Sequence, residues 1–167
     1  MRLVVIFTFI SIIPVIVQAS VIKYNHNSIT ISEISEKVRF KVYAPQQVPN
    51  NWTLEIKTYP WEETGIINYF RMHYMDKKDE KLLLGIEQRK KNSNKEELHL
   101  HAKQVDINGY VGYLEEWGNS GELDKKGELV TGGLLSWTQK GTYIQMNSSR
   151  ITKDKMLKIA RSLKIVK

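Results

Sequence analysis

Alternation of apolar and polar residues dominates the middle of the chain. Trp52, Leu54 and Ile56 alternate with polar neighbours, which is typical of a strand with one buried face. A later run places Leu82 and Leu84 on one side, together with Ile86. Similar runs occupy residues 66–75, 81–89, 98–103, 110–117, 134–138 and 142–146. The pattern therefore predicts a sheet of about six to seven strands.

Short turns join several of these runs. Asn108-Gly109 is the strongest turn signal, because both residues tolerate the positive φ of a type I′ hairpin. A second hairpin is expected across Lys140-Gly141. Since short connections link consecutive strands, we expect an antiparallel β-meander. Residues 44–51 contain two prolines and are expected to form a loop.

Helical patterns stand at both ends of the strand region. Ser32 precedes two glutamates and is the expected start of a short N-terminal helix that reaches about Arg39. Near the C-terminus, Thr152 is the expected N-cap, with Ile151 and Met156 as a hydrophobic staple. The apolar stripe of this predicted C-terminal helix consists of Met156, Ile159, Ala160 and Leu163. We therefore predict an α+β fold with the C-terminal helix packed on one face of the sheet.

The first nineteen residues resemble a secretion signal. Arg2 precedes an apolar run over residues 3–17, and Val17-Gln18-Ala19 places small residues where a signal peptidase reads them. An uncleaved membrane anchor is the alternative, but the run is shorter than the roughly 20 residues that span a bilayer. We expect a signal peptide over 1–19, a lead-in over 20–37 and one domain over 38–167. The protein is then secreted or held in the cell envelope, outside the cytoplasmic membrane.

The composition excludes cysteine-dependent sites and indicates which kinds of partner the protein can bind. The 167 residues include no cysteine and carry a formal net charge of +7. Disulfides, thiolate metal sites and cysteine nucleophiles are thereby excluded. The positive excess suits peripheral association with anionic envelope polymers or a membrane surface. The lysines are scattered apart from the block Arg89-Lys90-Lys91, so we expect no nucleic-acid partner.

No catalytic or cofactor motif is present. His99 and His101 alternate along a predicted strand and are the best metal candidates, but zinc needs at least three protein ligands. No Gly-x-Ser-x-Gly sequence occurs. Gly132-Gly133 lacks the lysine of a phosphate loop and indicates a bulge or close sheet packing. We therefore expect no catalytic residues, no cofactor and no metal, and a protein that is not an enzyme.

Aromatic residues offer the best candidate for a binding surface. The chain has four tryptophans and eight tyrosines, most of which we expect in the core. Trp61 and Tyr59 lie in the segment Tyr59-Pro60-Trp61, which is expected to connect two strands. They are candidates for a ligand platform on the open face of a curved sheet.

Several segments resemble a known family. Residues 38–45 and Val48-Pro49 precede the strand that starts at Trp52, and the chain closes with residues 151–163. Together with Asn108-Gly109-Tyr110 and the segment 134–137, these resemble the domain of unknown function 4367 over about residues 38–165. The resemblance implies a bacterial extracytoplasmic domain and no catalytic residues. The chain differs from tethered members in lacking a cysteine for a lipid anchor.

Three functions are compatible with these patterns. We expect a non-catalytic extracytoplasmic binding or sensing domain, whose partner is an unknown envelope protein. One alternative is a carrier that holds a lipid or another apolar ligand between the curved sheet and the helix. The other is a hydrolase without a recognisable motif.

Overall fold

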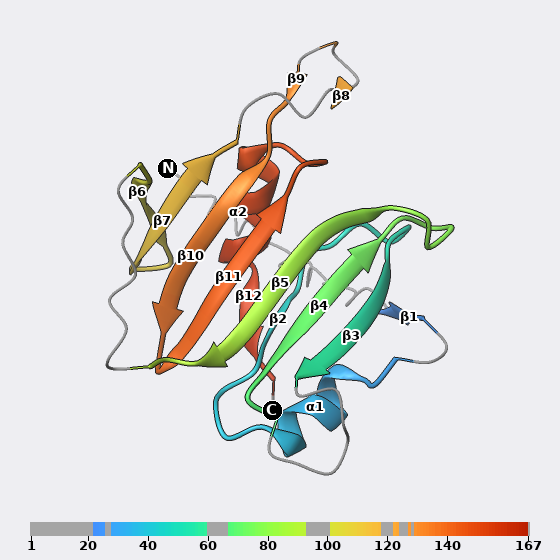
Figure 1. Cartoon of the computed structure of the whole chain (residues 1–167), viewed down its shortest axis with the longest axis vertical. Helices are drawn as coiled ribbons and strands as arrows, with labels where there is room; N and C mark the ends of the chain where they lie inside the picture. Colours follow the sequence, from blue (N-terminus) through green and yellow to red (C-terminus); the bar gives the residue numbers. More distant parts are fainter. Residues whose placement is uncertain are drawn as a thin grey trace, which may run out of the picture.

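The computed structural model describes residues 22–25, 28–59, 67–92, 101–117, 122–123, 127 and 129–166 (Figure 1). The predicted signal peptide over residues 1–19, Trp61 and His99 lie outside these residues. The helices are α1 (Ile31–Lys37) and α2 (Lys153–Arg161). The strands are β1 (Lys23–Tyr24), β2 (Tyr43–Pro45), β3 (Thr53–Tyr59), β4 (Tyr69–Met75), β5 (Leu82–Lys90), β6 (Lys103–Ile107), β7 (Tyr110–Glu116), β8 (Glu122–Leu123), β9 (Leu129–Val130), β10 (Gly133–Gln139), β11 (Thr142–Ser148) and β12 (Leu163–Ile165).

The main sheet is mixed and is not a simple meander. Its eight strands have the order β1-β3-β4-β5-β11-β10-β7-β6, and β1 pairs with β3 in parallel. The prediction of a meander holds from β3 to β5. The chain then passes to the far edge, forms β6, and returns through β7 and β10 so that β11 pairs with β5. Local turn signals could not reveal this crossover, because it depends on pairing between distant strands.

Both predicted hairpins are confirmed. Asn108 and Gly109 have φ values of 54° and 86°, and Lys140 and Gly141 have values of 45° and 86°. Positive φ at both central residues is the type I′ geometry, which matches the twist of the flanking strands. The strand before the first hairpin is β6 (Lys103–Ile107), which lies later in the chain than the predicted strand over 98–103; the described residues 101 and 102 are not part of it.

The prediction that Leu82 lies on the same side of β5 as Leu84 and Ile86 is wrong. Leu84 and Ile86 are fully buried, but Leu82 is 40% exposed. The register between β4 and β5 shifts between Tyr74 and Met75, which pair with Leu84 and Leu82. A bulge of this kind changes the side-chain alternation locally, so Leu82 no longer faces the core.

A small second layer corrects two further predictions. Residues 44–51 are not all loop, because β2 includes Ala44 and Pro45 and pairs with β12. Pro45 is tolerated because it ends the strand, where a missing N–H costs least. Helix α2 does not continue through Leu163 but ends at Arg161, with Ser162 as its C-cap. Leu163 is buried as expected, but it belongs to β12.

The helices start at threonine caps. Thr152 caps α2 as predicted, and its side chain accepts a hydrogen bond from the backbone N–H of Lys155. Helix α1 begins after Thr30 rather than at Ser32. Thr30 and Glu33 form a capping box, in which each side chain bonds to the backbone of the other. The threonine therefore satisfies N–H groups that would otherwise be unpaired at the helix start.

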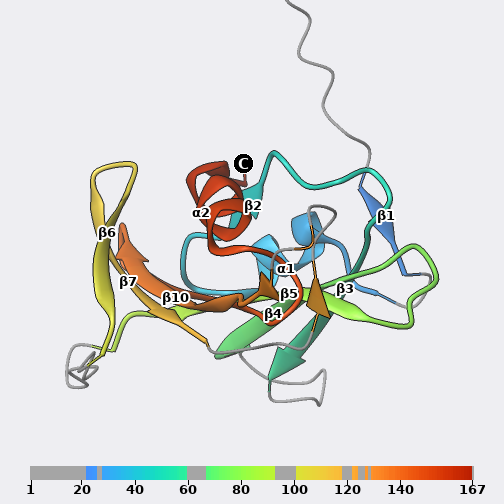
Figure 2. The same ribbon diagram turned by 90° about the horizontal axis from the view of Figure 1, so that it is seen from above.

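Helices and β2 lie on one face of the curved sheet, which we call the inner face (Figure 2). Ile34 of α1, Tyr43 of β2 and Met156 of α2 are fully buried there, and Phe40 stacks on Phe70 with ring centroids 6.1 Å apart. The sheet contributes Leu54, Ile56, Phe70, Met72, Tyr74, Leu84, Ile86, Leu135, Trp137, Ile144 and Met146 to the same core. Side chains thus fill the space between the sheet and its cover.

A buried glutamine attaches β2 to the sheet. Gln88 is fully buried, and its Oε1 accepts from the Tyr43 N–H at 2.9 Å while its Nε2 donates to the Tyr43 carbonyl at 2.7 Å. On the other side of β2, Val166 N–H donates to the neighbouring Val42 carbonyl at 2.9 Å. Gln88 thereby takes the place of a neighbouring strand for Tyr43, whose backbone would otherwise be buried without partners.

Two glycines permit close backbone packing beside β11, as the sequence indicates. Gly132 has a φ of 63°, and a Cβ atom there would lie 2.1 Å from the Ser148 carbonyl oxygen. A Cβ atom on Gly133 would lie 2.6 Å from the Glu115 carbonyl oxygen. Any larger residue would therefore force β7, β10 and β11 apart.

Neither of the described helices is long and apolar enough to cross a membrane.

We predict that Gln88→Met destabilises the fold by about 2–4 kcal/mol, because methionine keeps the volume but leaves the Tyr43 N–H and carbonyl unpaired in the core. Urea unfolding followed by tryptophan fluorescence measures the change. Gln145→Met is the matched control: Gln145 lies in the neighbouring strand β11, on the other face of the sheet from Gln88. It should change stability by less than about 1 kcal/mol. Equal effects of the two substitutions would contradict the role assigned to Gln88.

Candidate functional site

The face of the sheet turned away from the helices, which we call the outer face, carries polar and aromatic side chains in two adjacent rows. Register places them, because paired residues in neighbouring strands point to the same side. The first row consists of Tyr59, Tyr69, Arg89 and Tyr143. The second row consists of Lys57, Arg71, Glu87, Gln145 and Ser136.

Tyr59 and Tyr69 form a stacked pair at the β3–β4 end of the first row. Their ring centroids lie 4.5 Å apart, and the ring planes differ by 5°. The guanidinium carbon of Arg71 lies 5.7 Å from the Tyr59 centroid and 6.0 Å from the Tyr69 centroid. Aromatic pairs and nearby cations of this kind each contribute about 0.5–1 kcal/mol. The three side chains therefore hold one another in a defined position.

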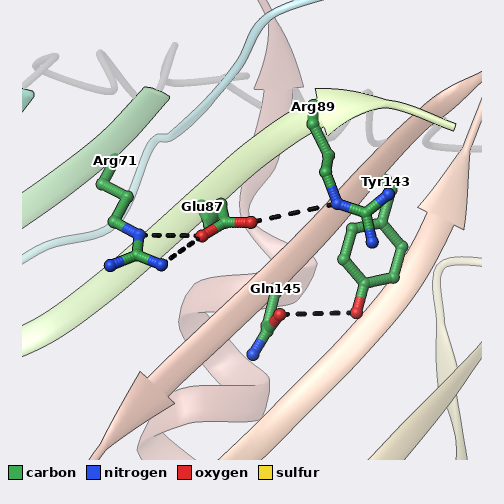
Figure 3. A network of polar contacts seen from close by, with 5 residues as sticks. All are labelled: Arg71, Glu87, Arg89, Tyr143 and Gln145. Carbon is green, nitrogen blue, oxygen red and sulfur yellow. Dashed lines mark hydrogen bonds and ion pairs between the residues drawn. The ribbon is translucent and has the colours of Figure 1, made fainter. Parts of the chain in front are cut away.

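Glu87 links the two arginines of the rows (Figure 3). Arg71 donates from Nε to Glu87 Oε2 at 2.8 Å, its Nη2 forms an ion pair with the same oxygen at 2.7 Å, and Arg89 Nε lies 3.9 Å from Oε1. The hydrogen bond to Glu87 raises the pKa of Arg71, so its charge is retained. The Glu87 carboxylate therefore holds Arg71 by a charge-assisted hydrogen bond and lies beside Arg89 as a shared counter-charge.

The second arginine packs on a tyrosine. The guanidinium carbon of Arg89 lies 3.9 Å from the Tyr143 ring centroid, and the Tyr143 hydroxyl donates to Gln145 Oε1 at 3.5 Å (Figure 3). We call Tyr59, Tyr69, Arg71, Glu87, Arg89, Tyr143 and Gln145 the outer-face cluster. Exposure is uneven within it: the Arg71 side chain is 47% exposed, that of Arg89 25%, and Tyr143 only 8%. Its accessible part is therefore the β3–β4 end.

A half-buried histidine borders this end of the cluster. His73 pairs across the sheet with Glu55 and Gly85. Because Gly85 has no side chain, the carboxamide of Asn147 lies over it, with Oδ1 2.4 Å from the position of an added Cβ. Burial, and then the charge of Lys57, lowers the pKa of His73, so the neutral imidazole is favoured.

The structure places only some of the predicted site residues. Tyr59 lies in β3 rather than in a connection, and its ring is part of the outer-face cluster. His101 is an exposed turn residue before β6, so it does not occupy the predicted strand. Trp61 and His99 lie outside the described residues, which contain no group of three or more potential metal ligands.

Most residues of the outer-face cluster were not among the predicted site residues. Tyr69 and Arg71 alternate in β4, as do Glu87 and Arg89 in β5. That period-2 signal was present in the sequence, and it assigns these residues to the polar side of their strands. Their meeting in two rows required the register between β4, β5 and β11, which no local pattern supplies.

Comparison with known proteins identifies one family. The family described as "Domain of unknown function (DUF4367)" matches residues 42–163, which cover most of the chain. This range extends from the segment before β2 to the first residue of β12. No curated protein and no solved structure matches the chain.

We predict that His73 makes the fold less stable as the pH falls from about 7.5 to about 5. Its pKa in the folded state is lowered below the unfolded value of about 6.5, so its contribution is present above that pH and is lost below it. The free energy of urea unfolding at both pH values should fall less in His73→Gln than in the parent. His101→Gln, which exchanges the same side chain outside the sheet, is the control. An identical pH dependence in parent and His73→Gln would contradict the prediction.

Proposed function

Because the chain belongs to the domain of unknown function 4367 family, whose description states no activity, we propose its function from its own geometry: it is a non-catalytic binding or sensing domain outside the cytoplasmic membrane. The outer-face cluster is its ligand-binding surface. The single observation that carries this proposal is the Tyr59–Tyr69 stack with the half-exposed Arg71 beside it.

This arrangement suits a ligand with both planar and polar groups. The stacked rings are already held in place, so little side-chain entropy is lost when a ligand contacts them. Arg71 is fixed by a hydrogen bond and an ion pair to Glu87 and still has about half of its side chain in solvent. Tyrosine and arginine in such positions are the residues that most often dominate binding energy at interfaces. We propose an envelope protein as the partner.

The packing of the inner face favours this surface over a site between sheet and helix. A carrier needs an apolar space that a ligand can occupy. Here Ile34, Tyr43 and Met156 fill the region between the layers and are fully buried against the sheet. A ligand held there would have to displace core side chains that stabilise the fold.

The proposed location outside the cytoplasmic membrane is supported by the first nineteen residues. Their charged start, apolar run and terminal Val17-Gln18-Ala19 have the order of a cleavable secretion signal. The absence of cysteine is compatible with an oxidising compartment, where free thiols would be modified.

Site-specific photo-crosslinking in the native cell tests the binding surface. We expect a photoreactive phenylalanine analogue in place of Tyr69 to give a discrete adduct, while the same analogue in place of Lys158, exposed on α2, gives none. Adding Arg71→Ala should reduce the Tyr69 adduct by about tenfold or more, as expected for a dominant contact. Adducts from both positions alike, or none from Tyr69, would overturn the proposed surface.

Intact mass of the protein recovered from the native cell tests the location. We expect the chain to begin at Ser20 and to be found in the envelope or the medium. Recovery of only the full-length chain with the membranes would instead favour the uncleaved anchor.

A further inference from the structure

Four exposed lysines from three separate segments meet at one end of the sheet. Lys90 and Lys91 end β5, Lys140 lies in the turn between β10 and β11, and Lys41 precedes β2. All four are exposed. We call them the basic corner. The sequence shows only its Lys90-Lys91 part as a block, and the fold adds the other two.

Backbone contacts fix this meeting. Lys91 N–H donates to the Gly141 carbonyl at 2.9 Å, beside Lys140, and Thr142 pairs with Lys90 in the β5–β11 register. The buried Thr142 hydroxyl donates to the Lys41 carbonyl at 2.7 Å. Figure 1 shows the end of β5 beside the β10–β11 turn. The four charges are therefore held together by the folded backbone.

None of the four lysines forms an ion pair with a carboxylate in the described part of the chain. Three lysines elsewhere in the described residues do form ion pairs: Lys103 and Lys153 both contact Glu116 at 3.1 Å, and Lys57 lies 3.5 Å from Glu55. Like charges gathered without counter-charges repel one another and destabilise the fold slightly. An anionic partner would remove that repulsion.

We infer that the basic corner is a docking surface for a membrane rich in anionic lipid. This inference is separate from the proposed ligand-binding surface, because the basic corner contains no residue of the outer-face cluster. The inference rests on the proposed function only for the cellular location, since export would bring the chain to the outer surface of the cytoplasmic membrane. Each lysine near such a surface strengthens binding by about fivefold, and these contributions multiply.

The geometry favours a membrane over a soluble anionic polymer. The lysines surround the tip of the β10–β11 hairpin and the end of β5, at one corner of the sheet. A broad layer of anionic head groups suits exposed lysines that come from three separate segments. Lysine is also a compact, flexible point charge, suited to a fluid head-group layer rather than to bidentate recognition of one phosphate.

The test is co-sedimentation of the protein, as recovered after export, with vesicles of phosphatidylcholine alone or mixed with phosphatidylglycerol. We expect binding only to the mixed vesicles, and its loss at about 1 M salt, where charges are screened. The triple variant Lys90→Gln, Lys91→Gln and Lys140→Gln should bind about 100-fold more weakly. The control is Lys77→Gln, Lys78→Gln and Lys81→Gln, which removes the same charge from the other end of β5 and should bind nearly as the parent does.

Three results would overturn the inference: equal binding to both vesicles, equal weakening by the two triple variants, or tighter binding to soluble polyphosphate than to vesicles of matched phosphate concentration. The last result would assign the corner to an anionic polymer. Crosslinking through Tyr69 is independent of these lysines, so the ligand-binding surface and the membrane surface can fail separately.

Discussion

The double hydrogen bond between Gln88 and the Tyr43 backbone is the constraint on which the two-layer arrangement depends. A buried amide is costly unless it is fully paired, and this one is paired by a strand outside the sheet. It fixes β2 to the C-terminal part of β5, and β2 in turn pairs with β12, the strand that follows α2. Helix α2 has polar contacts of its own with β6 and β7, because Arg161 donates to the Asp106 carbonyl and Lys153 to Glu116. The Gln88 attachment adds a fixed position for β2 and β12 beside it.

The layer of α1, α2 and β2, which Gln88 attaches to the sheet, determines which face of the sheet is accessible to a ligand. Once α1, α2 and β2 occupy the inner face, the alternate residues of every strand are directed to the other side. Those residues include three tyrosines and two arginines organised around Glu87, although a sheet face without function needs only soluble side chains. Holding these side chains in fixed positions costs conformational entropy. The proposed binding of a ligand would account for a surface that carries this cost.

The sequence predicted what depends on neighbours along the chain. The Asn108-Gly109 and Lys140-Gly141 turns, the Thr152 cap and the buried side of β3 all follow from local chemistry, and the structure has them. It could not predict the crossover from β5 to β6 or the β2–β12 pair, because these depend on contacts between residues far apart in sequence. For the same reason, Tyr59 was the only residue of the outer-face cluster that the sequence predicted as a site residue. The proximity of Lys41 and Lys140 to Lys90 also depends on the fold and could not be predicted.

Strand β5 connects the fold to both proposed surfaces through four consecutive residues. Gln88 points inward and holds the cover, Glu87 and Arg89 point outward into the outer-face cluster, and Lys90 ends the strand in the basic corner. Since a shift of one residue in a strand exchanges its faces, a slip in the β5–β11 register would bury Glu87 and expose Gln88. The buried amide therefore excludes the wrong register as well as stabilising the right one, and both surfaces depend on that choice.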